Sequence, residues 1–249
     1  MNRRTAKAMH ATANMAYWIE NPDWHTGNPF ADIALKAVRA LPFKVHEPLK
    51  RFFYNTDDLI AVNGESVVVA NGLNEVNKFM FRYPGKMATE AFFDHVRDEV
   101  EVVTEHLAGV ALPTMVSIRS ADIFRNPEAG VDTVTQTQRK IDLGINGSLD
   151  LDLLNEAKRE PLIDRTARDL EILVTGTARL VSEHGFYPDA AHGGGNVRVN
   201  SINGAVTLID VMPFYENGSR LIGDRPPNVI SHLQNNIAAY EEFVGQYGG

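Results

Sequence analysis

The chain has 249 residues, of which 44% are hydrophobic, enough for one large domain or two small lobes with a buried core. Its 24 Lys and Arg residues against 32 Asp and Glu residues give a formal net charge of -8. This charge disfavours a protein that binds nucleic acid through the phosphate backbone. Cysteine is absent, which excludes disulfides and thiolate metal sites.

No stretch approaches the roughly 20 apolar residues that are needed to cross a bilayer. The basic N-terminus is not followed by an apolar run of signal-peptide length, so we expect it to be retained. Together these features predict a cytoplasmic protein without a membrane span.

Residues 1–57 are expected to form a helical N-terminal extension. Two Ala-rich segments, 5–15 and 29–41, are separated by Asn-Pro-Asp and Gly-Asn-Pro breaks. The second segment carries an apolar helical face made of Ile33, Ala34, Ala37, Val38 and Leu41. We expect this face to pack within the protein; binding of a protein partner or self-association is the alternative.

The next segment, 59–82, predicts a three-stranded antiparallel meander. Three β-rich runs are separated by two Asn-Gly pairs, which are typical of hairpin turns. In the third run, alternation places Lys78 on one strand face with Val76 and Met80. A lysine among apolar residues needs a partner for its charge, unless it lies on an edge strand and reaches solvent.

The segment from Thr89 to Leu107 predicts an amphipathic helix, because its apolar residues recur every three or four positions. Glu99 lies at the edge of the expected buried face, whereas Glu101 and Glu105 turn toward solvent.

Two later runs, 114–124 and 131–138, predict strands that complete a five-stranded sheet. A connecting hinge is expected at 137–144. Pattern and capping signals then predict three helices, at 149–158, 162–184 and 228–247. On the second, Asp164, Asp169 and Glu171 are expected to face solvent or to cap the helix and not to be catalytic.

The stretch 184–212 holds the residues that are suited to chemistry. Short β-rich runs at 197–200 and 205–209 flank an Asn-Gly turn, which predicts a hairpin. Asn196 precedes the first run and Asp210 follows the second, so antiparallel pairing brings them close together. An amide oxygen beside a carboxylate suits a hard cation such as Mg²⁺.

An Asn, a short hairpin and then an Asp resembles the protein-kinase-like superfamily, whose catalytic loop leads in this way into a metal-binding Asp-Phe-Gly. Here Asp210 is followed by Val-Met instead of Phe-Gly. Asp189 precedes Asn196 by seven positions, whereas the family's catalytic Asp precedes its Asn by five. The glycines at 193–195 can absorb the longer loop, and His192 is similar to the histidine in Asp-x-His-x-Gly-Asn loops of small-molecule and atypical kinases.

The resemblance, over roughly residues 58–215, implies an α+β, two-lobed protein-kinase-like fold with a small antiparallel-sheet N-lobe and a mainly helical, shortened C-lobe. The larger helical subdomain and the Ala-Pro-Glu segment of typical protein kinases have no counterpart, so the chain would be an atypical or minimal member. The expected domains are a helical extension, an N-lobe with one helix, and a minimal C-lobe, at 1–57, 58–140 and 141–249.

The resemblance also implies a nucleotide site. Lys78 would contact the α and β phosphates of ATP, and Glu99 would pair with that lysine. The first hairpin turn, with Gly64 and Ser66, would cover the phosphates, although it is shorter and poorer in glycine than the family's loop.

The remaining roles concern the metal and the acceptor. Asn196 and Asp210 would hold Mg²⁺, and Asp189 would orient or deprotonate a hydroxyl acceptor. The implied function is ATP- and Mg²⁺-dependent transfer of the γ-phosphoryl group to a small molecule or a specialised protein target.

Two alternatives keep the same fold. One is a catalytically weak or inactive kinase-like protein that binds nucleotide and regulates a partner, which the missing Phe-Gly and the short glycine turn favour. The other is an AMP transferase that uses the same groups. A Zn²⁺ site on His184, His192 and Asp189 is disfavoured, because His184 ends a predicted helix and no His-Glu-x-x-His helix is present.

Overall fold

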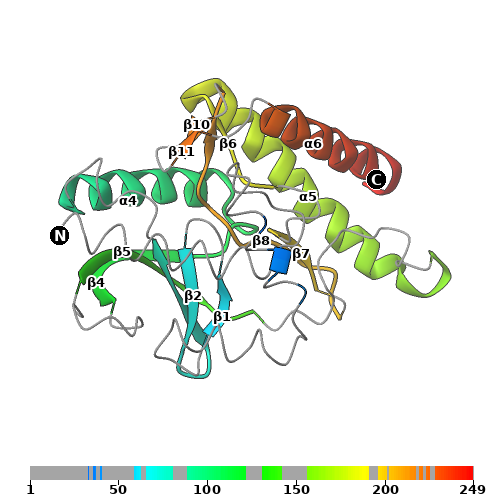
Figure 1. Ribbon diagram of the computed structural model, residues 1–249. Coiled ribbons are helices and arrows are strands. Elements are labelled where there is room, and N and C mark those ends of the chain that lie inside the picture. Colours follow the sequence, from blue (N-terminus) through cyan, green and yellow to red (C-terminus); the bar gives the residue numbers. More distant parts are fainter. Residues whose placement is uncertain are drawn as a thin grey trace. The chain divides into compact units, whose positions relative to one another are not determined.

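The computed structural model is α+β, and Figure 1 shows its helices and strands. The described residues are Ile33, Lys36, Ala37 and Ala40, and then 59–62, 66–80, 89–121, 131–141, 156–190, 196–200, 202–216, 219–220, 223–224 and 228–248. A small sheet and three long helices in this part of the chain are compatible with a kinase-like fold. The two-lobed arrangement stays a prediction.

The main sheet has five strands in the order β1-β2-β3-β5-β4. The pairs β1–β2, β2–β3 and β3–β5 are antiparallel, which confirms the predicted meander. Gly72 closes the β2–β3 turn with a φ of 70°, a left-handed conformation that glycine adopts without steric cost. The strands are β1 (Leu59–Val62), β2 (Ser66–Asn71), β3 (Glu75–Met80), β4 (Thr114–Ala121) and β5 (Val131–Arg139).

The expected hinge at 137–144 begins too early. β5 continues through Arg139, and Thr137 pairs with Asn77 in the ladder with β3. The Thr137 hydroxyl also donates to the Asn77 side chain at 2.8 Å. This buried polar contact keeps the first residues of the expected hinge in the strand.

The chain divides into two compact units, Met1–Asp94 with Met115–Lys140, and His95–Thr114 with Ile141–Gly249. The five-stranded sheet lies in the first unit. Helix α4 (Thr89–His106) ends one residue before the predicted end at Leu107, and it contributes most of its residues to the second unit. The predicted domains stay a prediction.

Helix α5 spans Glu156–His184 in the second unit. Two helices were predicted here, and this is wrong, because Pro161 lies inside one continuous helix. A proline removes a single backbone donor, and the helix beyond it has an extensive face to bury. The buried residues of that face include Ile163, Thr166, Ala167, Leu170, Leu173, Thr177 and Leu180.

Helix α6 (Asn228–Tyr247) has the bounds that the sequence predicted and packs along α5, as the red and yellow-green helices in Figure 1 show. Its buried side chains are Leu233, Asn236, Tyr240 and Phe243. Short two-residue strands connect the helices: β6 (Phe186–Tyr187), β9 (Phe214–Tyr215), β10 (Ser219–Arg220) and β11 (Gly223–Asp224).

Little of the N-terminal extension is described. Ile33, Lys36 and Ala37 are helical, and the amide of Ala40 donates to the carbonyl of Lys36 at 3.1 Å. Ile33 is 67% exposed, so the expected packing of the apolar face is not seen at this residue. The other predictions for 1–57 lie outside the described residues.

Within the described part of the chain, none of the helices combines the length and apolar character that crossing a membrane requires.

Candidate functional site

The hairpin predicted near the centre of the site is present. β7 (Val197–Val199) pairs antiparallel with β8 (Val206–Leu208). The side-chain oxygen of Asn200 accepts a hydrogen bond from the amide of Ile202 at 2.8 Å. The side-chain oxygen of Asn203 accepts one from the amide of Ala205 at 3.0 Å. Asn side chains that cap nearby backbone amides stabilise tight turns, so the local sequence favours this hairpin.

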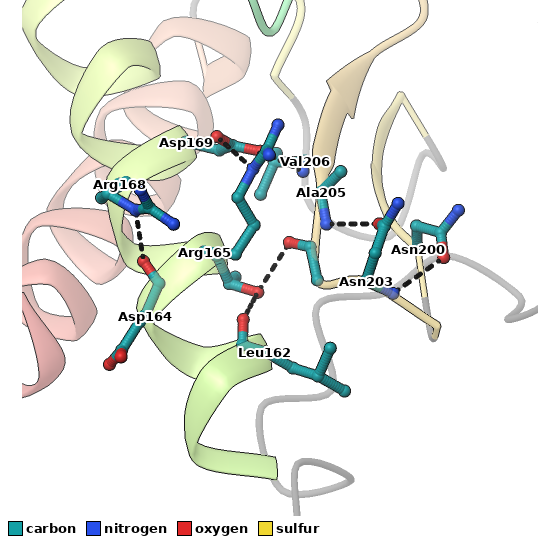
Figure 2. Close-up of polar contacts among 11 residues, drawn as sticks. Leu162, Asp164, Arg165, Arg168, Asp169, Asn200, Asn203, Ala205 and Val206 are labelled. Carbon is teal, nitrogen blue, oxygen red and sulfur yellow. Dashed lines mark hydrogen bonds and ion pairs between the residues drawn. The ribbon is translucent and has the colours of Figure 1, made fainter.

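Helix α5 anchors the turn end of the hairpin, as Figure 2 shows. The buried Asp169 carboxylate accepts the amide of Val206 at 2.9 Å and pairs with Arg165 at 2.9 Å. The Thr166 hydroxyl lies 2.8 Å from the carbonyl oxygen of Gly204, to which it can donate. Asp169 was expected to face solvent or cap the helix; it instead holds the hairpin, because an interior carboxylate is stable when it is paired and hydrogen-bonded.

The segment after α4 holds the other side of the hairpin. The amide of Leu208 donates to the carbonyl of Val110 at 2.8 Å, and the amide of Leu112 donates to the carbonyl of Leu208 at 2.9 Å. Asp210, two residues beyond Leu208, therefore follows a strand that is bonded on both edges.

Asn196 and Asp210 lie at the open end of the hairpin. The amide of Ile209 donates to the carbonyl of Asn196 at 2.7 Å, which extends the ladder by one step and leaves Asp210 as the next residue. The Asp210 carboxylate accepts the amide of Met212 at 3.1 Å, and this contact orients it. Both residues are half-buried. Their oxygens are of the kind that Mg²⁺ binds, and metal binding itself stays a prediction.

Asp189 is buried in the same unit, with 7% of its surface exposed. The chain around it is held on both sides. β6 pairs with β9 just before it, and Tyr240 of α6 donates to the carbonyl of Ala190 just after it at 3.2 Å. The Gly193–Gly195 run and His192, which follow, lie outside the described residues.

Glu99 is 3% exposed and lies in a cluster of three polar side chains. His95 Nε2 lies 2.9 Å from Glu99 Oε1, and the Tyr215 hydroxyl donates to the same oxygen. Burial, and then the hydrogen bond to Glu99, raise the pKa of Tyr215 well above its ordinary value. His95 precedes Glu99 by one helical turn, a detectable signal, but no sequence signal pointed to Tyr215. The predicted Lys78 partner belongs to the other unit, and that ion pair stays a prediction.

In the first unit, Lys78 is 9% exposed and lies on an interior strand of the sheet. The alternative of an edge-strand lysine in solvent is therefore wrong. Ser66 is fully buried at the start of β2, and its register places it on the same sheet face as Lys78. Gly64 lies outside the described residues.

Gln136 was missed by the sequence analysis. It pairs directly with Lys78 across β3 and β5, so their side chains share one face. Gln136 is fully buried, and among the described residues neither of its amide atoms has a hydrogen-bond partner. The available signal was the alternation in β5, which places Gln136 and Gln138 on the face of Val134. An unsatisfied buried amide is costly, and a bound ligand would remove that cost.

Comparison with known proteins assigns no family. No protein-family model and no curated protein sequence matches the chain. Distant matches among solved structures include the bifunctional kinase-methyltransferase WbdD at 20% identity and a TM-score of 0.32, covering 74% of this chain and 34% of that chain. A structure of WbdD with the kinase inhibitor LY294002 matches at 17% identity and a TM-score of 0.34, covering 75% and 45%. The chain thus spans less than half of these proteins, and similarity at this level assigns no function.

The predicted residues fall into two sets. Ser66 and Lys78 lie on one sheet face of the first unit, together with Gln136. The second unit holds the other set, which consists of Glu99, Asp189, Asn196 and Asp210. The first set offers a cation and an amide to an anionic ligand, and the second offers oxygen ligands to a cation.

Proposed function

We propose that the protein is an ATP- and Mg²⁺-dependent phosphotransferase that moves the γ-phosphoryl group of ATP to a hydroxyl acceptor. The observation that carries this proposal is the open end of the β7–β8 hairpin. There the amide of Ile209 donates to the carbonyl of Asn196, and Asp210 is the next residue of the chain. Both lie in the same unit as the buried Asp189. The Asp210 carboxylate follows a strand bonded at both edges, and together with the Asn196 amide it suits Mg²⁺, which usually completes its shell with substrate phosphates and water.

Each residue has a stated role in the proposal. Asn196 and Asp210 hold the metal, and Lys78 neutralises the phosphate oxygens. Asp189 orients the acceptor hydroxyl or accepts its proton. When bound, Mg-ATP supplies the phosphoryl group and part of the charge neutralisation. Because phosphoryl transfer depends mainly on positioning and electrostatics, losing Asp210 should reduce turnover more than losing Asp189.

The sheet face around Lys78 supports a nucleotide ligand. Lys78 can contact phosphate oxygens, and the adjacent Gln136 amide, which has no partner among the described residues, can both donate and accept hydrogen bonds. A nucleotide presents phosphate oxygens and a base with donors and acceptors. It therefore complements both side chains, which an apolar ligand would not.

One observation favours the second candidate, a nucleotide-binding regulatory protein with weak or no catalysis. The Glu99 carboxylate is engaged by Tyr215 and His95, both in its own unit. In the proposed transferase Glu99 pairs with Lys78, so Tyr215 and His95, which both contact Glu99 Oε1, compete with Lys78 for this oxygen.

Thermal unfolding with ATP, in the presence and absence of Mg²⁺, tests nucleotide binding. Ligand at about 100 times its dissociation constant should add roughly 2.7 kcal/mol to the native state. Lys78→Met and Asp210→Asn should each remove the Mg²⁺-dependent shift. Two exposed matched controls, Lys140→Met and Asp164→Asn, should retain it. Absence of a shift in the well-folded wild type would refute the proposal.

ATP labelled on the γ or the α phosphorus then separates the possible reactions. Transfer of γ label to hydroxyl acceptors, lost in Asp210→Asn, is the expected result. Transfer of α label would indicate AMP transfer instead. Mg-ATP binding without transfer or hydrolysis over a broad acceptor panel would support the regulatory protein.

A further inference from the structure

The C-terminal ends of α4 and α5 bring together three side chains that the proposed phosphotransferase does not use. His106, Glu183 and His184 each place one possible ligand atom within 4.8 Å of the others. His106 Nε2 lies 3.1 Å from Glu183 Oε2, and the rings of His106 and His184 meet edge to face with centroids 5.1 Å apart. All three residues belong to the second unit.

The hydrogen bonding of His106 leaves one ring nitrogen directed at the carboxylate. His106 Nδ1 lies 2.9 Å from the carbonyl oxygen of Val102, which can only accept, so Nδ1 carries a proton. A neutral ring would then present the Nε2 lone pair to Glu183. Two acceptors 3.1 Å apart need a cation between them, either a proton or a metal ion. Metal-bound histidines usually donate their other N–H to a carbonyl or carboxylate, as His106 does.

The spacing between His106 and Glu183 fits a tetrahedral ion. Zn²⁺ binds histidine nitrogen and carboxylate oxygen at about 2.0 to 2.2 Å, which places neighbouring tetrahedral ligands roughly 3.3 Å apart. The 3.1 Å separation of His106 Nε2 and Glu183 Oε2 is close to this value. His184 stacks on Phe186 with ring centroids 5.7 Å apart, which restricts its imidazole. Two imidazoles and one carboxylate suit Zn²⁺ and similar transition metals better than Mg²⁺.

We propose that His106, Glu183 and His184 form a Zn²⁺-binding site that fastens the end of α4 to the end of α5. Water would occupy the remaining position, because the Glu183 side chain is 56% exposed and the site is open to solvent. The ion would be structural. Its effect would be greatest on the chain that leaves α5 at Gly185 and continues through β6 toward Asp189.

This site differs from the disfavoured set of His184, His192 and Asp189. It shares only His184 with that set, and Asp189 is buried on the segment held by Tyr240. The competing explanation is an ion pair between protonated His106 and Glu183 that braces the two helices without a metal. Glu183 raises the pKa of His106, as such a pair would.

Calorimetric titration of the chelator-treated 249-residue chain with Zn²⁺ at pH 8 separates these explanations. One ion should bind at this cluster. His106→Gln, Glu183→Gln and His184→Gln should each weaken it about tenfold or more, the scale seen for perturbing metal-site partners. His232→Gln, an exposed histidine of the same unit, should bind Zn²⁺ like the wild type. Mg²⁺ at the same concentrations should give no such binding.

Two outcomes would overturn the proposal: no Zn²⁺ binding by the wild type, or binding that all three variants retain at full strength. Glu183→Gln changes an exposed side chain, so it keeps the test decisive if a histidine variant misfolds. Asp210→Asn should bind Zn²⁺ normally. Failure of the phosphotransferase proposal is therefore distinguishable from failure of this one.

Discussion

At the scale of single residues, the polar side chains that are least exposed to solvent indicate best where a ligand could bind. Gln136 and Lys78 share a buried sheet face, and Glu99 shares a buried cluster with Tyr215. Burying such groups costs free energy unless each finds a partner. Gln136, whose amide atoms have no hydrogen-bond partner among the described residues, is therefore a candidate for ligand binding.

Gln136→Met tests whether the buried Gln136 amide lowers the stability of the fold while contributing to nucleotide binding. Methionine has a similar length and no amide, so we expect the free energy of unfolding to rise by about 1–3 kcal/mol. The Mg-ATP-dependent thermal shift should fall. Urea unfolding and thermal unfolding measure the two effects. Thr135→Val, on the opposite face of β5, should leave the ATP shift unchanged, and an unchanged shift in Gln136→Met would show that Gln136 does not bind nucleotide.

Tyr215→Phe tests the hydroxyl that holds Glu99. The buried carboxylate loses a donor, so we expect the free energy of unfolding to fall by about 1–3 kcal/mol in urea. Tyr187→Phe, on the paired strand, removes a hydroxyl that accepts an exposed hydrogen bond from Gln234 and should cost much less. Equal losses in the two variants would contradict a special role for the Glu99 contact.

At the scale of elements, α5 acts as the support for the β7–β8 hairpin. Asp169 and Thr166 bond its backbone from one side, and residues 110–112 bond it from the other. The hairpin turn also approaches α5 closely at Gly204. A Cβ at this glycine would lie 2.3 Å from the carbonyl oxygen of Leu162.

Gly204→Ala should therefore displace the hairpin from the helix. Gly204 and Gly72 both have a φ of 70°, but a Cβ at Gly72 meets nothing within 4 Å. Gly72→Ala should cost about 1–2 kcal/mol from backbone strain alone. Gly204→Ala adds overpacking and should cost about 2–5 kcal/mol. Equal losses of unfolding free energy in the two variants would show that the backbone near Leu162 shifts to accommodate the new Cβ at no cost.

At the scale of the whole molecule, the free energy of unfolding should fall at alkaline pH, because Tyr240 of α6 loses its proton. Burial raises the pKa of Tyr240 to about 12, above the ordinary value of about 10. The folded state therefore favours the neutral phenol. This contribution is fully present below pH 10 and is lost as the pH rises from about 10 to 12.

The full contribution of Tyr240 is roughly 2–3 kcal/mol, because each pKa unit corresponds to about 1.4 kcal/mol. Urea unfolding between pH 8 and pH 12 should show the loss. Tyr240→Phe removes the titrating group and should make the decline shallower, although it also removes the bond to the Ala190 carbonyl. The same pH slope in the variant and the wild type would assign the decline to other groups.

Local pattern predicted most elements well, including the meander, α4, the β7–β8 hairpin and the bounds of α6. Such features depend on residues close in the chain, namely alternation, helical periodicity and Asn-Gly turns. It failed at Pro161, where burial of the face that follows outweighs the loss of one helical hydrogen bond. It also failed at Asp169, because the Val206 amide that it binds is 37 positions away.

In the candidate site, too, some features could be predicted from local sequence and others could not. The ends of the hairpin, Asn196 and Asp210, follow from local sequence, because a tight turn sets the pairing of its own strands. The Tyr215 contact of Glu99, the lack of a partner for the Gln136 amide among the described residues, and the His106–Glu183–His184 cluster required the tertiary structure. Tyr215 is 116 positions from Glu99 and His106 is 77 positions from Glu183, so long-range packing decides these contacts, whereas His95 lies one helical turn from Glu99.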